Sequence, residues 1–159
     1  MKELIDFKKY LNLDVDDRLD LHYIFMQTAL LFSTRSECQR KHVGCVITQD
    51  NRIVSVGYNG NYHSGPACTY DDSCPLDSAG TCLRSIHAET NALAFCAKHS
   101  IKTDGATMYI TLSPCLSCAK MIVQSGIKRI YYLEEYRNIE GLEYIKNTEL
   151  IKVYKYGEQ

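Results

Sequence analysis

The sequence predicts an α/β protein with a three-layer α/β/α fold, in which helices cover both faces of a mixed five-stranded sheet. One observation is a set of five short runs rich in β-branched and aromatic residues, the usual composition of strands. Another is the order of the elements. Two runs follow one another directly in the first half, which favours an antiparallel hairpin. Strands and helices alternate in the second half, which requires crossover connections and therefore parallel pairing.

The first half of the chain holds the first predicted helix, the hairpin and a long loop. Apolar residues at helical spacing predict a helix over residues 18–36. The runs at 43–48 and 52–57 are separated by three polar residues and predict the two antiparallel strands. Residues 58–85 are rich in Gly, Asn, Ser, Asp and Pro, which indicates a loop, and the part over 60–85 carries cysteines.

The second half alternates helices with strands. Its predicted elements are a helix from 87 to 98, a strand over 106–111, a helix over 115–125 that Gly126 ends, a strand over 128–133, a helix over 137–147 and a strand over 150–154. With 159 residues the chain is expected to form a single domain over 1–159. Residues 1–17 have mixed charge and are expected to be an N-terminal extension, either a mobile arm or a subunit contact.

Two short motifs carry the chemistry, His87-Ala88-Glu89 and, downstream, a Pro-Cys-x-x-Cys run that contains Cys115 and Cys118. One histidine and two cysteines can give Zn²⁺ three ligands and leave the fourth tetrahedral position to water, as in catalytic sites. The carboxylate of Glu89 could then take a proton from that water and deliver it to a substrate nitrogen. A closed zinc site or two packed thiols would need neither the glutamate nor the proline.

The spacing of these residues fits a metal site. Cys115 and Cys118 are three residues apart, so they share a face on the first turn of a helix, and Pro114 suits a helix start. Both thiolates would lie at the positive end of that helix, which favours the ionised form. We place His87 at the very start of the preceding helix, because positions i and i+2 of a regular helix point about 200° apart.

Composition limits the partners. The formal net charge is −1, with both signs spread along the chain, so no basic surface for nucleic acid is expected. No apolar run reaches membrane length and no signal peptide is recognised, so no membrane partner is expected. Eight cysteines could form a disulfide scaffold, but reduced thiols that bind metal in the cytoplasm are the better interpretation.

The order His-x-Glu followed by Pro-Cys-x-x-Cys is the signature of zinc deaminases, which attack C4 of cytosine or C6 of adenine. Together with Gly57-Tyr58-Asn59-Gly60 and the block from 105 to 128, the chain resembles the deoxycytidylate (dCMP) deaminase family from about residue 20 to 154. The resemblance implies a cytidine-deaminase-like fold and hydrolytic deamination of dCMP to dUMP, which feeds thymidylate synthesis. The alternatives are a zinc deaminase of cytidine or cytosine, of dCTP, or of adenosine in tRNA, and a binding protein that has lost catalysis.

The resemblance also implies roles for individual residues. His87, Cys115 and Cys118 would bind the catalytic zinc, and Glu89 would carry protons from the attacking water to N3 and then to the departing amine. The backbone around Ala88 and Ser113 would hold the pyrimidine ring. Asn59 matches the residue that hydrogen-bonds the sugar in related deaminases, although Asn-Gly is also the commonest tight-turn pair.

Regulation and assembly follow from the same resemblance. In this family Gly-Tyr-Asn-Gly is associated with a regulatory nucleotide, dCTP activating and dTTP inhibiting, with Mg²⁺ on the phosphates. Tyr58, Asn59 and Gly60 could therefore serve a second site. Family members with this regulation are hexamers, so a homo-oligomer, specifically a hexamer, is expected.

The remaining cysteines suggest a second metal. Four thiolates make a closed structural zinc site, and the candidates lie in or beside loops: Cys38, Cys68, Cys74 and Cys82. His63 is the expected substitute if one cysteine is not used, and scattered reduced thiols are the alternative. Cys45 and Cys96 fall within strand and helix patterns and are expected in the core.

Substrate phosphate would need cations, and four of them flank the loops near the motifs: Arg35, Arg40, Lys41 and Arg84. The sequence favours none of the four over solvated surface charge. Twelve tyrosines with no tryptophan could suggest base stacking, but several, such as Tyr131 and Tyr132, fall in strand patterns. Core and subunit contacts are the simpler interpretation of these tyrosines.

Overall fold

A computed structural model describes residues 18–62, 65, 75–78 and 80–157 of the chain. The elements follow in the order α2 (Leu21–Ser33), β1 (Gly44–Gln49), β2 (Arg52–Tyr58), α3 (Ala88–Lys98), β3 (Thr107–Leu112), α4 (Leu116–Gln124), β4 (Arg129–Glu134), α5 (Glu140–Thr148) and β5 (Lys152–Lys155). The five predicted strands and four predicted helices are therefore confirmed, with ends that differ by a few residues.

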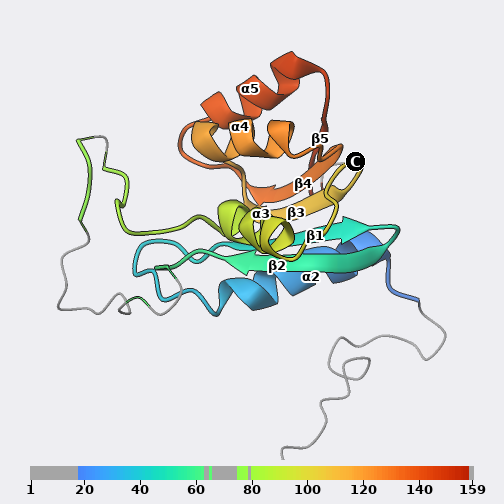
Figure 1. Cartoon of the computed structure of the whole chain (residues 1–159), viewed down its shortest axis with the longest axis horizontal. Helices are drawn as coiled ribbons and strands as arrows, with labels where there is room; N and C mark the ends of the chain where they lie inside the picture. The colour runs from blue at the N-terminus through green and yellow to red at the C-terminus, as the bar shows by residue number, and fades with distance from the viewer. Residues whose placement is uncertain (1–17, 63–64, 66–74, 79, 158–159) are drawn as a thin grey trace, which may run out of the picture.

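The strands form one mixed sheet in the order β2-β1-β3-β4-β5 (Figure 1). β1 pairs antiparallel with both β2 and β3, and the pairs β3 with β4 and β4 with β5 are parallel. The hairpin turns at Asp50 and Asn51, whose φ angles of 50° and 59° are left-handed, and Gln49 already pairs with Arg52. The connection is thus a two-residue turn, shorter than the three residues that the sequence suggested.

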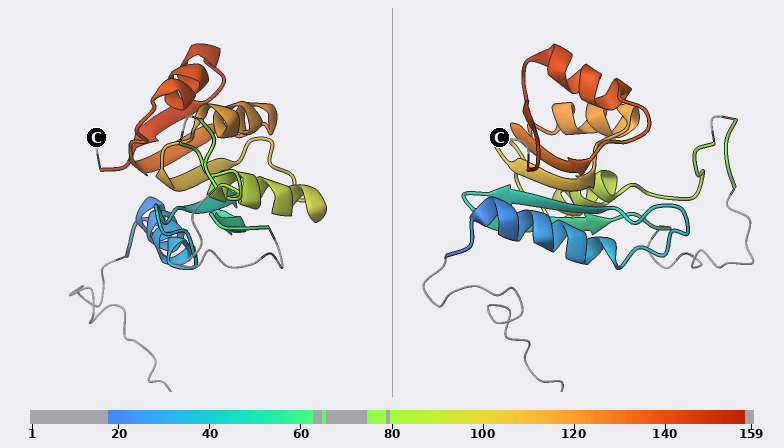
Figure 2. Two further views of the ribbon diagram at one scale, coloured as in Figure 1. Left: turned by 90° about the vertical axis from the view of Figure 1, so that its left-hand side faces the viewer. Right: turned by 180° about the vertical axis from the view of Figure 1, so that it is seen from behind.

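The sheet separates two apolar clusters. On one face α2 packs on the β1–β3 part through Phe25, Met26 and Ala29, against Val46 and Tyr109. On the other face α3, α4 and α5 bury residues that alternate with these along the same strands: Cys45 and Ile47 of β1, Met108 and Ile110 of β3, and Ile130 and Tyr132 of β4. Figure 1 shows α3 in front of the sheet, and the rear view in Figure 2 shows α2 over β1 and β2. The predicted three layers are confirmed.

The start of β1 and the ends of β3 and β4 lie at the same end of the sheet. The reason is the strand directions, since β1 runs antiparallel to β3 while β4 runs parallel to β3. α4 starts near this end of the sheet, because it begins four residues after β3 ends. α3 packs on β1 and β2. Loops after parallel strands are common positions for ligand sites.

Helix ends differ slightly from the predictions. The predicted helix 18–36 is shorter, because the Asp20 side chain accepts a hydrogen bond from the N–H of Tyr23 at 3.2 Å and caps the helix there. Pro114 lies one residue before the N-cap Cys115 of α4, outside the first turn. None of the helices in the described residues combines the length and apolar character that a membrane crossing needs.

The close approach of β1 to α2 depends on a glycine. A Cβ atom at Gly44 would overlap the carbonyl oxygen of Ala29 and lie 2.9 Å from the backbone nitrogen of Ser33. Both neighbours are helix backbone, so neither can move away at low cost.

We therefore predict that Gly44→Ala lowers the free energy of unfolding by about 3 kcal/mol, the cost of overpacking against a rigid neighbour. Urea denaturation followed by circular dichroism measures the change. Gly60→Ala is the matched control, because a Cβ there meets no atom within 4 Å. Equal stability of the two variants would show that β1 and α2 can separate freely.

Candidate metal and active site

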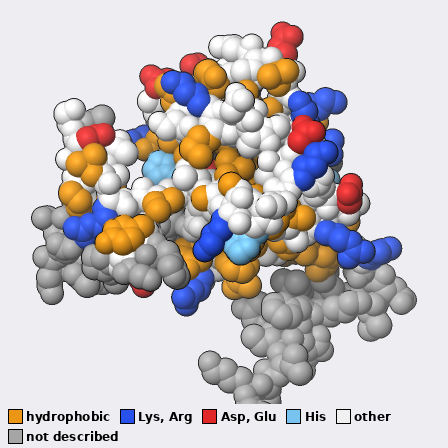
Figure 3. All heavy atoms as spheres, in the orientation of Figure 1, with side chains coloured by type: hydrophobic (Ala, Val, Ile, Leu, Met, Phe, Trp, Pro, Cys, Tyr) orange, Lys and Arg blue, Asp and Glu red, His pale blue; other side chains and the backbone are white. Residues whose placement is uncertain are grey.

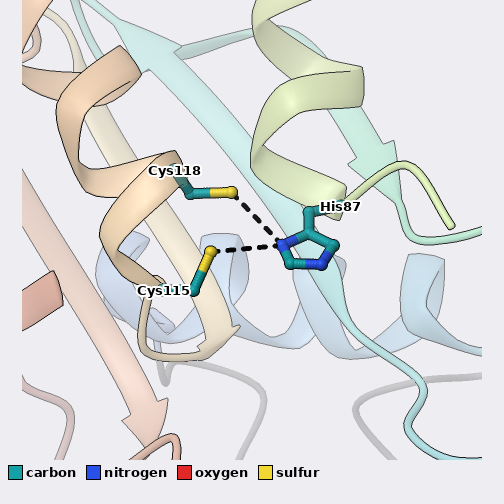
Figure 4. A group of neighbouring side chains, drawn as sticks. All are labelled: His87, Cys115 and Cys118. Carbon is teal, nitrogen blue, oxygen red and sulfur yellow. Dashed lines mark hydrogen bonds between the residues drawn. The ribbon is translucent and has the colours of Figure 1, made fainter. Parts of the chain in front are cut away.

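The structure brings His87, Cys115 and Cys118 together from two helices (Figure 4). His87 is the N-cap of α3, and Cys115 is the N-cap of α4, with Cys118 on its first turn. The Nδ1 atom of His87 lies 3.5 Å from the sulfur of Cys115 and 3.4 Å from the sulfur of Cys118. In the part of the chain that the structure describes, these three form the one group of His, Cys, Asp and Glu side chains close enough to hold a metal ion.

The spacing of these atoms fits zinc. A tetrahedral Zn²⁺ with about 2.3 Å to sulfur and about 2.05 Å to nitrogen would separate the two ligand atoms by about 3.6 Å. The two observed separations, 3.5 and 3.4 Å, are close to that value. One imidazole and two thiolates also suit zinc better than magnesium or calcium, which prefer oxygen ligands. Three protein ligands leave the fourth position open, which is typical of a catalytic site.

The electrostatics favour a thiolate at this site. A hydrogen bond with Cys118 lowers the pKa of Cys115 to about 4, and a hydrogen bond with His87 adds to that effect. The pKa of Cys118 is raised in turn, because Cys118 supplies the proton that Cys115 shares. The hydrogen bond with Cys115 also raises the pKa of His87. The N-terminal ends of α3 and α4 add positive partial charge beside the sulfurs, which further stabilises the ionised form.

Glu89 lies next to this group and is buried, with 4% of its surface exposed. Burial is the main cause of its raised pKa. A carboxyl group whose pKa moves towards neutrality can both accept and return a proton near pH 7. Its position on the first turn of α3, two residues after the N-cap His87, follows from the non-helical φ and ψ of His87, −73° and 154°.

A cavity of about 460 Å³ opens over these side chains. Its lining includes the candidates Asn59, His87, Ala88, Glu89, Ser113 and Cys115. The volume falls within the range of small-molecule sites, and the buried carboxyl and the metal-binding group converge on it. Cys118 lines a neighbouring cavity, which His87 and Cys115 also line.

Asn59 and Ser113 are tied to the chain itself. The Asn59 side chain accepts a hydrogen bond from the N–H of Val43 at 2.7 Å and donates one to the carbonyl of Lys41 at 2.8 Å. The backbone N–H of Ser113 donates a hydrogen bond to the backbone carbonyl of Glu134 at 2.8 Å. The Ser113 hydroxyl accepts a hydrogen bond from the backbone N–H of Tyr136, also at 2.8 Å. These two residues therefore join the loop before β1 and the loop after β4 to the cavity.

The other residues of Gly-Tyr-Asn-Gly also connect segments. A Cβ atom at Gly57 would overlap the carbonyl oxygen of Ala88, so this glycine allows β2 to touch the start of α3. The carbonyl of Tyr58 accepts a hydrogen bond from the side chain of Asn91 on α3 at 2.9 Å. Gly60 and Ile86 exchange two backbone hydrogen bonds. Tyr58 and Gly60 do not line the cavity that contains Glu89.

The candidate ligands of a second metal are only partly described. Cys38 and Cys82 line the cavity over Glu89, although they are far apart in the sequence. Cys68, Cys74 and the alternative ligand His63 lie outside the described residues. Cys45 and Cys96 are buried in the core cluster on the α3 side, as predicted.

Sequence reasoning missed several residues of the site. Thr90 places its hydroxyl 3.7 Å from the sulfur of Cys118, and its spacing of three residues from His87 on a helix could have indicated this. Tyr136 and Arg137 line the cavity from the loop after β4. Only the parallel pairing of β3 with β4 places that loop beside Cys115.

The chain is similar to known proteins of one family. Residues 20–134 match the family model described as the cytidine and deoxycytidylate deaminase zinc-binding region. ComE operon protein 2 of Bacillus subtilis is 40% identical over 121 residues, which cover 76% of this chain and 63% of that protein. The deoxycytidylate deaminase of Enterobacteria phage T4 is 34% identical over 166 residues, 81% of this chain and 86% of the phage protein.

A solved structure is similar along most of the chain. The dCMP deaminase of the cyanophage S-TIM5, crystallised in complex with dCMP and dUMP, superposes with a TM-score of 0.73 and 35% sequence identity. The match covers 87% of this chain and 98% of that one. By contrast, the chain spans less than two thirds of the length of the Bacillus subtilis relative.

Proposed function

The chain belongs to the cytidine and deoxycytidylate deaminase family, and from this premise we propose that it hydrolyses dCMP to dUMP and ammonia. The observation that carries the proposal is the buried Glu89 beside the His87, Cys115 and Cys118 group, in the lining of a cavity of about 460 Å³. The similar cyanophage enzyme that binds dCMP and dUMP supports the choice of substrate.

The proposed reaction replaces the amino group at C4 of the pyrimidine by oxygen. Zinc held by His87, Cys115 and Cys118 would lower the pKa of water and supply the nucleophile at neutral pH. Glu89 takes a proton from the attacking water and gives it to N3 of the ring. Glu89 then transfers the second proton to the amino nitrogen, so that ammonia leaves and C4 becomes a carbonyl. The raised pKa of Glu89 suits this double transfer.

Three further residues are proposed to hold the substrate. The backbone at Ala88 and Ser113, both of which line the cavity, would contact the pyrimidine ring. The Asn59 amide uses one hydrogen for Lys41 and has a second, with which it would hold the deoxyribose. Its buried position and its two bonds to the loop before β1 support a fixed orientation.

Regulation at Gly-Tyr-Asn-Gly is also proposed, with dCTP activating and dTTP inhibiting, and Mg²⁺ on their phosphates. Two contacts support it: the Asn91 side chain donates a hydrogen bond to the carbonyl of Tyr58, and Gly60 and Ile86 exchange backbone hydrogen bonds. They connect the motif to both sides of His87, so a nucleotide bound there could affect the metal site. If the motif serves only the fold, neither dCTP nor dTTP should change the rate of deamination.

We further propose a cytoplasmic homo-oligomer, a hexamer as in regulated family members. On the α2 side of the sheet three tyrosine rings stack in a row. The ring centroids of Tyr109 and Tyr131 are 5.1 Å apart, and those of Tyr131 and Tyr154 are 4.9 Å apart. Tyr154 is 39% exposed. Partly exposed aromatic rows are suited to subunit contacts. Sedimentation analysis measures the assembly, and a monomer at all concentrations would contradict it.

A second, structural zinc is proposed on Cys38, Cys68, Cys74 and Cys82, with His63 as a substitute ligand. The shared cavity of Cys38 and Cys82 supports two of these ligands. Four thiolates would hold the loop over 60–85, which has few apolar residues for a core of its own.

The substrate is tested by following the absorbance change on deamination. We expect turnover of dCMP in preference to cytidine, CMP and dCTP, stimulated by dCTP and suppressed by dTTP with Mg²⁺. Turnover of adenosine in tRNA without turnover of any free nucleotide would contradict the substrate assignment. Surface charge argues against that outcome, since acidic and basic side chains are interspersed on the face in Figure 3.

Glu89→Gln is predicted to lower kcat by at least about a thousandfold, because an amide of nearly the same shape cannot carry the proton. Zinc content and the circular dichroism spectrum should match those of the unaltered protein. Turnover that survives in a zinc-loaded, folded variant would exclude Glu89 as the proton carrier.

Elemental analysis is predicted to find about two zinc ions per chain. Cys118→Ser should remove the catalytic ion and abolish activity, whereas Cys38→Ser should remove the other ion and lower thermal stability. A value near one in the unaltered protein, lost only in Cys118→Ser, would rule out the second site.

A further inference from the structure

The hydroxyl of Thr90 lies beside two sulfur atoms of the neighbouring helix. Thr90 is on the first turn of α3, three residues after His87, so the two side chains share a face of that helix. The Thr90 oxygen is 3.7 Å from the sulfur of Cys118 and 3.9 Å from the sulfur of Met121, which both belong to α4. Thr90 therefore touches α4 at a candidate metal ligand and one turn beyond it.

The two sulfurs differ as acceptors for the one hydrogen of the hydroxyl. A thioether such as that of Met121 is a weak acceptor. A thiolate carries charge, and hydrogen bonds to charged groups are about twice as strong as those between neutral groups. A cysteine that binds zinc is ionised, so in the metal-bound protein the Thr90 hydrogen is directed to Cys118.

The burial of Cys118 makes a donor at this point important. Cys118 is 3% exposed, so water has little access to its sulfur. Cys115, the other thiolate candidate, is only half-buried. A buried charge without hydrogen bonds is costly, and the Thr90 hydroxyl supplies a donor to the more buried of the two sulfurs.

We propose that Thr90 is a positioning residue of the zinc site, whose hydroxyl donates a hydrogen bond to the Cys118 thiolate and holds that sulfur towards His87 and Cys115. Side chains that hydrogen-bond to metal ligands orient them, and their loss lowers metal affinity by about 10- to 100-fold. The bond also draws electron density away from the sulfur, which leaves a bound metal ion a stronger Lewis acid. This inference rests on the zinc site of the proposed function and is independent of the choice of substrate.

Zinc affinity is the first test, and Thr90→Val is the variant, because valine keeps the shape of threonine and has a methyl group in place of the hydroxyl. A chelator of known affinity competes with the protein for zinc, and Cys118→Ser identifies which ion belongs to this site. The Kd for that ion should rise at least about tenfold in Thr90→Val. In Thr90→Ser, which keeps a hydroxyl, it should change less than about threefold.

Met121→Leu is the matched control, because it removes the other sulfur that Thr90 touches. Its Kd for zinc should stay within about threefold of that of the unaltered protein. A loss of affinity in Met121→Leu as large as that in Thr90→Val would show that Thr90 acts through the packing of α3 on α4. That result would overturn the proposal.

Cobalt substitution gives a second readout, which a purely structural role of Thr90 would not move. Co²⁺ bound to thiolates absorbs light by charge transfer from sulfur to metal. Without the hydrogen bond the sulfur gives up an electron more easily, so this band should shift to longer wavelength in Thr90→Val and return in Thr90→Ser. An unchanged band in folded, cobalt-loaded Thr90→Val would contradict the proposed bond.

Neither measurement requires turnover, which separates this inference from the proposed function. If Thr90→Val loses zinc affinity and the unaltered protein deaminates no nucleotide, the role of Thr90 stands and the proposed activity falls. If Thr90→Val binds zinc as tightly as the unaltered protein does, Thr90 is not a positioning residue, whatever the activity.

Discussion

The contact between the first residues of two helices is the constraint on which the site depends. His87 caps α3 and lies within 3.5 Å of both sulfurs at the start of α4. Two helix N-termini that point at one place concentrate positive partial charge there, and such a place favours anions. Thiolates meet that requirement, and two of them also offset the charge of a divalent metal. The chemistry of the ligands and the direction of the helices therefore support each other.

The sheet supplies the rigidity that this contact needs. α3 and α4 pack on the same face, and their buried side chains alternate with those that face α2. Small residues set the spacing at critical points, because Gly57 lets β2 reach the start of α3 and Gly44 lets β1 reach α2. Within this framework Glu89 is buried beside the candidate metal ligands. Burial then raises its pKa towards the range in which proton transfer is efficient.

Gly-Tyr-Asn-Gly illustrates how a motif can look like a binding site in the sequence and also serve the fold. Asn59 uses its amide to hold the backbone of Lys41 and Val43. Tyr58 and Gly60 connect to Asn91 and Ile86 on either side of His87. The amide nitrogen of Asn59 carries two hydrogens, and the contact with Lys41 uses one of them. Their first effect, however, is to hold three segments of chain around one cavity.

The order and type of the elements could be predicted from the amino-acid sequence, and so could the choice of His87, Cys115 and Cys118 as candidate ligands of a metal. Local periodicity places each strand and helix within a few residues, and Cys115 and Cys118 lie on one helical turn whatever the rest of the chain does. Which residues line the cavity, by contrast, depends on the tertiary structure. Lys41 and Glu134 are 93 residues apart, and no local pattern connects them. They meet because the strand order puts β1 and β4 on either side of β3, a choice made by packing of the whole sheet.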